Sequence, residues 1–189
     1  YDQMILEKAG LNLAGVVRAE GDTFRWSGKY EGAMESVETL ATEVNVLADF
    51  KPNLPEVWEN PEVLFCASTH PDTQVAVLDQ CPGAQLTVLD TFMLWIETEF
   101  QTLSEAMRKV DIVVINEQEV CAIAEDEILP RAMKSIISGE ALHGGSAAGS
   151  GPRCLIAKRG SGGVIAMLPA GTLSLPAYPT DEIVDPTGC

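Results

Sequence analysis

The chain has 189 residues, of which 46% are hydrophobic and 21% charged, a size and composition typical of one globular domain with a real core. Its 12 basic and 28 acidic residues give a net charge of −16, and such a surface repels nucleic acid and anionic membranes. We therefore expect neither as a partner, although a local positive pocket could still hold a nucleotide, and no apolar run is long enough to span a bilayer.

The chain contains five cysteines, which are scattered at positions 66, 81, 121, 154 and 189 without a C-x-x-C pair. Most of them lie in apolar runs, which is typical of reduced core residues in a cytosolic protein. No signal peptide is visible at the first residues, which also lack an initiator Met. We therefore expect a cytoplasmic location, and the start of the sequence fits a fragment.

The first third of the chain predicts a small β element. A helix is expected over Met4–Ala9, and strands over Leu13–Arg18 and Thr23–Tyr30 with a hairpin turn between them. Phe24 and Trp26 alternate with polar residues in the second strand, so this element could be a flap over a site or an ordinary sheet edge. The run 37–46 has helix-forming character and ends before two prolines.

From residue 62 onward, short apolar strands alternate with helices. Strands are expected over Val63–Ala67, Gln85–Leu89, Ile112–Ile115, Leu155–Lys158 and Val164–Leu168. Helices are expected over Thr73–Gln80, Leu103–Val110, Glu117–Ala124 and Pro130–Ser138. This alternation predicts an α/β fold, a parallel sheet with helices on both faces, with a hairpin at an antiparallel edge over 163–179. The glycine-rich run 143–152 is expected to be a flexible surface loop.

Polar residues gather where the predicted strands end. In an open α/β sheet, ligands bind beyond the carboxyl ends of the strands. The polar residues at these ends are Ser68, Thr69, His70, Asp90, Thr91, Asn116, Glu117, Glu119, Lys158, Asp185 and Thr187. A second interpretation explains part of this pattern, because Asn116 and Glu119 have the spacing of a helix capping box.

Three short motifs carry a resemblance to a known family. They are Asn116-Glu117-Gln118-Glu119, Lys158-Arg159-Gly160-Ser161-Gly162-Gly163 and Asp185-Pro186-Thr187-Gly188-Cys189. In this order and spacing they resemble the PfkB carbohydrate kinase, or ribokinase-like, family. The resemblance implies a parallel sheet flanked by helices, with a small β lid near the N-terminus that covers the sugar. It makes residues 1–189 a partial domain, with the lid and its surroundings at about 11–55 and the α/β core at 62–189.

The resemblance also implies roles for individual residues. Asn116 and Glu119 match a motif that places Mg²⁺ and the phosphates. Lys158 and Gly160 match the strand end that approaches the phosphates and ribose of ATP. Asp185 and Thr187 match positions that bind a monovalent cation in many members, and Gly188 begins the backbone anion hole. Phe24, Trp26 and Asp90 are the candidate substrate residues.

The sequence departs from the family at its end. The catalytic Asp of the family is expected two positions beyond Cys189, so we assign no catalytic base to any residue here. The N-terminal sugar-binding strands and the adenine-binding loops are expected to be missing as well. The leading hypothesis is an inactive fragment of an ATP-dependent sugar kinase that uses Mg²⁺.

Two alternatives remain open. The first is a nucleoside kinase of the same family, because the aromatic lid could stack on a base. The second is a non-catalytic α/β domain that binds nucleotide or self-associates. A homo-oligomer is expected in either case, because a truncated sheet exposes apolar edges.

Overall fold

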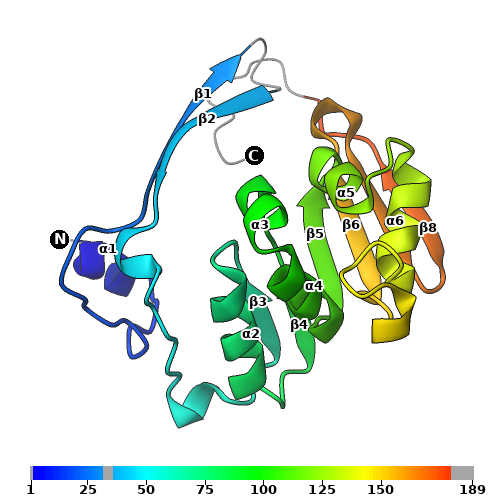
Figure 1. Cartoon of the computed structure of the whole chain (residues 1–189). Helices are drawn as coiled ribbons and strands as arrows, with labels where there is room; N and C mark the ends of the chain where they lie inside the picture. Colours follow the sequence, from blue (N-terminus) through cyan, green and yellow to red (C-terminus); the bar gives the residue numbers. More distant parts are fainter. Residues whose placement is uncertain (1, 32–35, 180–189) are drawn as a thin grey trace.

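The computed structural model describes residues 2–31 and 36–179. Figure 1 shows an antiparallel hairpin standing beside a six-stranded sheet that carries helices. The strands are β1 (Arg25–Glu31), β2 (Ser36–Glu43), β3 (Val63–Cys66), β4 (Leu86–Leu89), β5 (Ile112–Asn116), β6 (Cys154–Lys158), β7 (Val164–Leu168) and β8 (Gly171–Leu175). The α-helices are α1 (Asp2–Lys8), α2 (Pro71–Gln80), α3 (Met93–Thr98), α4 (Phe100–Lys109), α5 (Glu117–Ala124) and α6 (Leu129–Ser138).

The large sheet has the strand order β3-β4-β5-β6-β7-β8. The pairs from β3 to β6 are parallel, and β7 and β8 continue the sheet as antiparallel strands. The predicted α/β class, the mostly parallel sheet and the antiparallel edge are therefore confirmed. Parallel strands are joined by helical crossovers, which is why α2 and the later helices alternate with the strands.

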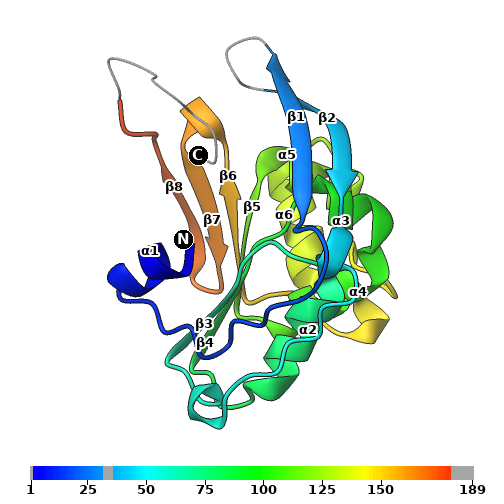
Figure 2. The same ribbon diagram turned by 90° about the vertical axis from the view of Figure 1, so that its left-hand side faces the viewer.

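The core lies between the sheet and the helices α2–α6, which Figure 2 shows on one side of the sheet. Alternate strand residues point into this layer, and Leu89, Val113 and Leu155 are fully buried there. The helices contribute an apolar stripe each, and Leu103 of α4 and Met133 of α6 are fully buried. Burial of such side chains is worth roughly 1.5–3 kcal/mol each, so this layer carries most of the stability.

The opposite face of the sheet is also apolar. Val63 and Phe65 of β3 are 57% and 58% exposed, and Leu173 and Leu175 of β8 are 50% exposed. Figure 2 shows α1 on this side, but its Met4, Ile5 and Leu6 are themselves exposed. Strands that are apolar on both faces are typical of parallel sheets. The sequence analysis expected helices on both faces, whereas among the described residues α2–α6 lie on one side and only the short α1 lies on the other.

The small β element forms, but from different partners than predicted. Its second strand is β2, where a helix was predicted over 37–46, and β2 pairs antiparallel with β1. The β-branched residues Thr39 and Thr42 of β2 suit a strand, and pairing with β1 outweighs the weak helix propensity. The predicted strand at 13–18 is wrong. This segment turns instead, with the Val16 N–H donating to Leu13 O at 2.9 Å.

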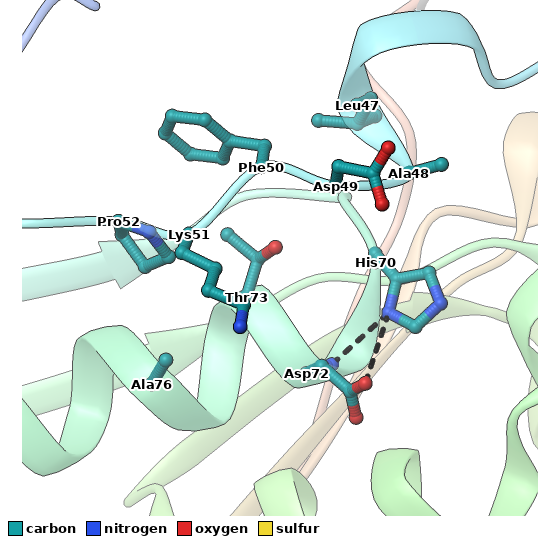
Figure 3. A pocket seen from close by; sticks show the side chains of 10 residues that line it. All are labelled: Leu47, Ala48, Asp49, Phe50, Lys51, Pro52, His70, Asp72, Thr73 and Ala76. Atoms are coloured by element: carbon teal, nitrogen blue, oxygen red, sulfur yellow. Dashed lines mark hydrogen bonds and ion pairs between the residues drawn. The ribbon is translucent and has the colours of Figure 1, made fainter.

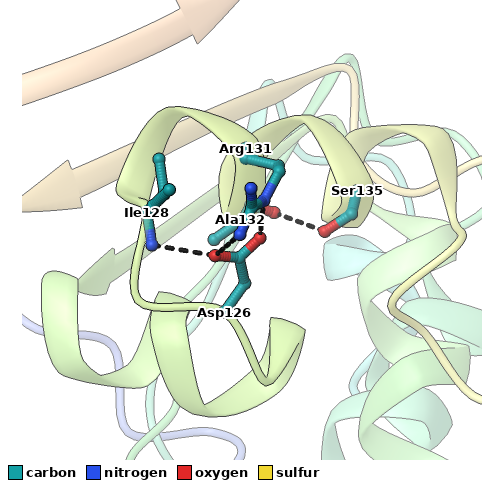
Figure 4. A network of polar contacts seen from close by, with 5 residues as sticks. All are labelled: Asp126, Ile128, Arg131, Ala132 and Ser135. Carbon is teal, nitrogen blue, oxygen red and sulfur yellow. Dashed lines mark hydrogen bonds and ion pairs between the residues drawn. The ribbon is translucent and has the colours of Figure 1, made fainter.

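The connection between α5 and α6 shows how a short corner is fixed (Figure 4). The Asp126 carboxylate accepts hydrogen bonds from the Ile128 N–H at 2.9 Å and from Arg131 Nη2 at 2.8 Å. These contacts lower the pKa of Asp126, chiefly through the Arg131 hydrogen bond.

Within the described part of the chain, no helix combines the length and the apolar character needed to cross a membrane.

Candidate functional site

The carboxyl ends of three neighbouring strands meet at one edge of the sheet. Asn116 of β5 is in register with Lys158 of β6, and Leu89 of β4 is in register with Val113 of β5. Asp90 directly follows Leu89. The parallel pairing therefore brings Asp90, Asn116 and Lys158 to the same edge, as the positions of the predicted strand ends indicated.

The charged groups at this edge influence one another. Glu119 is only 6% exposed, and its burial raises the pKa of its carboxyl to about 7. The hydrogen bond from the Asn116 N–H and the charge of Lys158 lower this pKa, whereas the nearby Asp90 raises it further. Burial also raises the pKa of Asp90, while Lys158 and the Thr91 N–H lower it. Two carboxyls and one ammonium thus share a partly desolvated site, where charges act strongly on a ligand.

Asn116 and Glu119 also form a capping box at the start of α5. The Glu119 N–H donates to Asn116 Oδ1 at 2.8 Å, and the Asn116 N–H donates to Glu119 Oε2 at 2.8 Å. The predicted capping arrangement is confirmed. It uses Asn116 Oδ1 and Glu119 Oε2. Glu119 Oε1 takes no part in the capping box, so this oxygen is available to a cation or its water.

A tight glycine turn follows Lys158. The turn is a 3₁₀ helix over Gly160–Gly162, and Gly163 leaves it with a φ of 80°. A Cβ at Gly163 would lie 2.1 Å from the carbonyl oxygen of Leu175, so only glycine fits here. Gly160 is exposed, which leaves the turn open for a ligand to approach its backbone.

Of the candidate substrate residues, Trp26 lies in β1 of the hairpin and Phe24 directly precedes that strand. Figure 1 shows the hairpin standing apart from the large sheet and its helices. The Trp26 ring lies against Gly28, where a Cβ would come within 2.1 Å of the indole. Trp26 Nε1 donates to Thr39 Oγ1 at 3.3 Å. The indole is therefore held on the hairpin as a flat aromatic surface by contacts with Gly28 and Thr39.

A polar cluster beside Asp90 was missed by the sequence analysis. The buried Gln74 of α2 donates from Nε2 to the carbonyl oxygens of Ala67 at 3.0 Å and Asp90 at 2.9 Å, which ties the ends of β3 and β4 together. Thr91 Oγ1 and Trp95 Nε1 are buried, with no protein hydrogen-bond partner in the described part of the chain. Nothing in the local pattern distinguishes Gln74 from an ordinary helix residue.

His70 caps α2 at the same end of the sheet. Its Nδ1 accepts a hydrogen bond from the Asp72 N–H at 3.2 Å, and its ring centroid lies 4.8 Å from that of Trp95. Figure 3 shows His70 and Asp72 at a cavity of about 360 Å³ between α2 and the segment that follows the hairpin. The cavity is lined by Leu47, Ala48, Asp49, Phe50, Lys51, Pro52, His70, Asp72, Thr73 and Ala76. It is thus separate from the edge with Glu119 and Lys158.

The remaining predicted residues, Asp185, Thr187 and Gly188, lie outside the described residues. The structure therefore brings together Asp90, Asn116, Glu119, Lys158 and the glycine turn, and leaves the aromatic hairpin apart from them.

Comparisons with known proteins bear on the fold. No family model matches the chain, and no curated protein matches it. Solved structures do match. A nucleoside kinase of Burkholderia thailandensis in complex with inosine has a TM-score of 0.72 and 14% identity over 100% of this chain. The chain has the ribokinase-like fold.

Two further structures support the ribokinase-like fold. The nucleoside kinase of Methanocaldococcus jannaschii, an archaeal member of the ribokinase family, matches 99% of this chain with a TM-score of 0.71 and 14% identity. The ribokinase of Thermotoga maritima matches 96% with a TM-score of 0.65 and 15% identity. In all three comparisons the chain spans 57% of the length of the solved structure.

Proposed function

We propose that this protein takes part in ATP-dependent transfer of a phosphoryl group to a hydroxyl of a sugar or a nucleoside. The observation that carries the proposal is the convergence of Asp90, Glu119 and Lys158 beside the glycine turn, at the carboxyl edge of a ribokinase-like sheet. Phosphoryl transfer depends mainly on positioning the reactants and on stabilising charge. The carboxyls of Asp90 and Glu119 could position a hydrated Mg²⁺, and the ammonium of Lys158 could stabilise negative charge on the phosphates.

Mg²⁺ fits this edge of the sheet. No group of three or more His, Cys, Asp or Glu side chains suited to a metal occurs among the described residues. These residues therefore do not form a metal site made of protein ligands alone. Mg²⁺ usually keeps its waters and binds through one or two carboxylates together with substrate phosphates. Glu119, assisted by Asn116 and Asp90, would hold such a hydrated ion, which when bound neutralises phosphate charge.

The ammonium of Lys158 offsets negative charge on the phosphates, and the backbone at Gly160 allows their close approach. The proposal extends to Thr187 and Gly188 for the phosphates and to Asp185 for a monovalent cation. The acceptor would lie between the hairpin and Asp90. The flat indole surface of Trp26 favours a nucleoside, because a base has a flat face to stack on it, whereas a sugar would use its apolar face.

The test is binding of Mg·ATP to the 189-residue chain, followed with trinitrophenyl-ATP fluorescence and displacement by ATP. We expect Mg²⁺-dependent binding, and Lys158→Gln should weaken it about tenfold, because a charge-assisted contact is worth roughly 1.5–3 kcal/mol. Lys134→Gln removes an exposed lysine on α6 as a matched control and should bind as the wild type does. The proposal fails if Mg·ATP does not bind, or if Lys158→Gln binds equally well.

The acceptor class is tested by titrating a panel of nucleosides and free sugars while following tryptophan emission. A nucleoside should quench the emission of the wild type but not of Trp26→Leu. Trp58→Leu, outside the hairpin in a 3₁₀ turn, is the control. Quenching by sugars alone would favour the sugar kinase.

A further inference from the structure

One ion pair joins the two halves of the candidate site. Arg159 Nε donates to Glu117 Oε2 at 3.1 Å, and the two side chains are 33% and 39% exposed. Glu117 is the first residue of α5, two positions before Glu119. Arg159 follows Lys158 and precedes the glycine turn. Because Asn116 and Lys158 are in register, the ion pair bridges the segments that follow β5 and β6 just beyond the sheet.

Arg159 is also part of the turn through its backbone. Its N–H donates to Gly163 O at 2.9 Å, and its carbonyl oxygen accepts from the Gly162 N–H at 2.9 Å. Its side chain crosses over Gly162, where a Cβ would lie 3.4 Å from Arg159 Cβ and 3.6 Å from its Cζ. The residue whose backbone closes the turn is therefore the one whose side chain reaches across to α5.

We propose that Glu117 and Arg159 are positioning residues, a clamp that holds the Gly160–Gly163 turn in place against the capping box of α5. The proposal rests on the function proposed above, since the turn is the candidate phosphate cradle. Backbone hydrogen bonds and the pairing of Lys158 with Val164 already close the turn. A half-exposed ion pair contributes little to folding stability, so we expect its effect to fall on where the turn sits relative to the first turn of α5. Misplacement of binding groups weakens binding even where no contact is lost.

The variant Glu117→Gln separates this role from simple electrostatics. Removing a negative charge near a triphosphate should tighten nucleotide binding if only charge matters. The clamp predicts the opposite. We expect Glu117→Gln and Arg159→Gln each to weaken trinitrophenyl-ATP binding about threefold or more, while Arg159→Lys, which keeps a cation opposite Glu117, stays closer to the wild type.

A second measurement does not depend on nucleotide. Amide hydrogen exchange of residues 160–163, followed by NMR, should be faster in Glu117→Gln and Arg159→Gln than in the wild type, by about threefold or more. The thermal midpoint should stay within about 4 °C of the wild type, because an exposed pair is worth less than about 1 kcal/mol. The control is Lys109→Gln, which removes the 2.7 Å ion pair between Lys109 and Asp79. Lys109 ends α4 just before β5 begins, so it lies at the end of β5 opposite to the turn. This variant should change neither binding nor exchange at the turn.

The outcomes separate the two proposals. Glu117→Gln that binds as tightly as the wild type, or more tightly, overturns the clamp while leaving the proposed function intact. A wild type that does not bind the nucleotide overturns the proposed function. In that case the exchange data decide the clamp, which is upheld by faster exchange in both variants and overturned by unchanged exchange.

Discussion

At the scale of single residues, Arg108 of α4 organises a long surface segment. Its guanidinium donates to a group of backbone carbonyl oxygens between α6 and β6, those of Gly139, His143, Gly145, Gly149 and Ser150. Ser104, one turn earlier, accepts the His143 N–H at 3.0 Å. The run 143–152, predicted to be a flexible loop, is thus tied to α4.

We predict that Arg108→Met lowers the free energy of unfolding by about 2–3 kcal/mol, because carbonyl groups that were bonded to a charged donor lose it together. Urea denaturation followed by circular dichroism measures the change. The control is Arg153→Met, whose side chain is 77% exposed and lies 3.5 Å from Asp111. It should lower the free energy of unfolding by less than about 1 kcal/mol. Equal effects of the two substitutions would contradict the role given to Arg108.

A second prediction at this scale concerns the buried carboxyl of Glu119, whose pKa is raised from 4.5 to about 7. Between these two values the folded state binds more protons than the unfolded state, so stability falls as pH rises. Glu119→Gln removes this dependence and can keep the capping box, since Gln also accepts the Asn116 N–H.

The free energy of unfolding of Glu119→Gln, relative to the wild type, should therefore increase by about 1–3 kcal/mol between pH 5 and pH 8. Urea titrations of both proteins across this range measure the difference. Parallel pH profiles would show that Glu119 ionises as freely in the folded chain as in the unfolded one.

At the scale of elements, the first turn of α5 has two duties that substitution can separate. Asn116 caps the helix, and it also stands at the edge proposed for Mg²⁺ and phosphate. Asn116→Ala should cost about 1 kcal/mol of stability, whereas Asn116→Ser should cost little because serine is also a good cap.

If Asn116 also acts on the ligand, Asn116→Ser should keep the thermal midpoint of the wild type but weaken Mg·ATP binding. Calorimetric titration of the two variants and the wild type measures this. If Asn116→Ser binds Mg·ATP as tightly as the wild type does, Asn116 acts only as a helix cap.

The element scale also shows what local sequence can predict. The strands β3–β7 were expected near their observed positions because each is a short apolar run bounded by polar or turn residues. Residues 37–46 were misjudged because the partner strand β1, not the local propensity, decides their conformation. The site edge was predictable because strand ends alone place Asp90, Asn116 and Lys158. The Glu117–Arg159 pair and the contacts of Arg108 join residues about 40 positions apart, and no local pattern encodes them.

At the scale of the whole molecule, the sheet face opposite α2–α6 dominates the expected behaviour in solution. Phe65 and Val63 at one edge and Leu173 and Leu175 at the other are half exposed or more, and apolar patches of this kind favour association. The net charge of −16 opposes it by repulsion between copies, and salt screens that repulsion over about 8–10 Å at 0.1–0.15 M.

We therefore predict that the 189-residue chain self-associates, more strongly at high salt than at low salt. Sedimentation velocity should give an average mass above the monomer value of 20.3 kDa that rises with protein and salt concentration. Phe65→Gln should shift the distribution toward monomer without changing net charge. Val57→Gln, which removes an apolar side chain that is 80% exposed outside the sheet, should not shift the distribution.

A monomer at every concentration and salt level would mean that this face does not drive association. A decrease with salt would instead place the contacts among charged groups, because screening weakens ionic attraction and leaves apolar contacts intact.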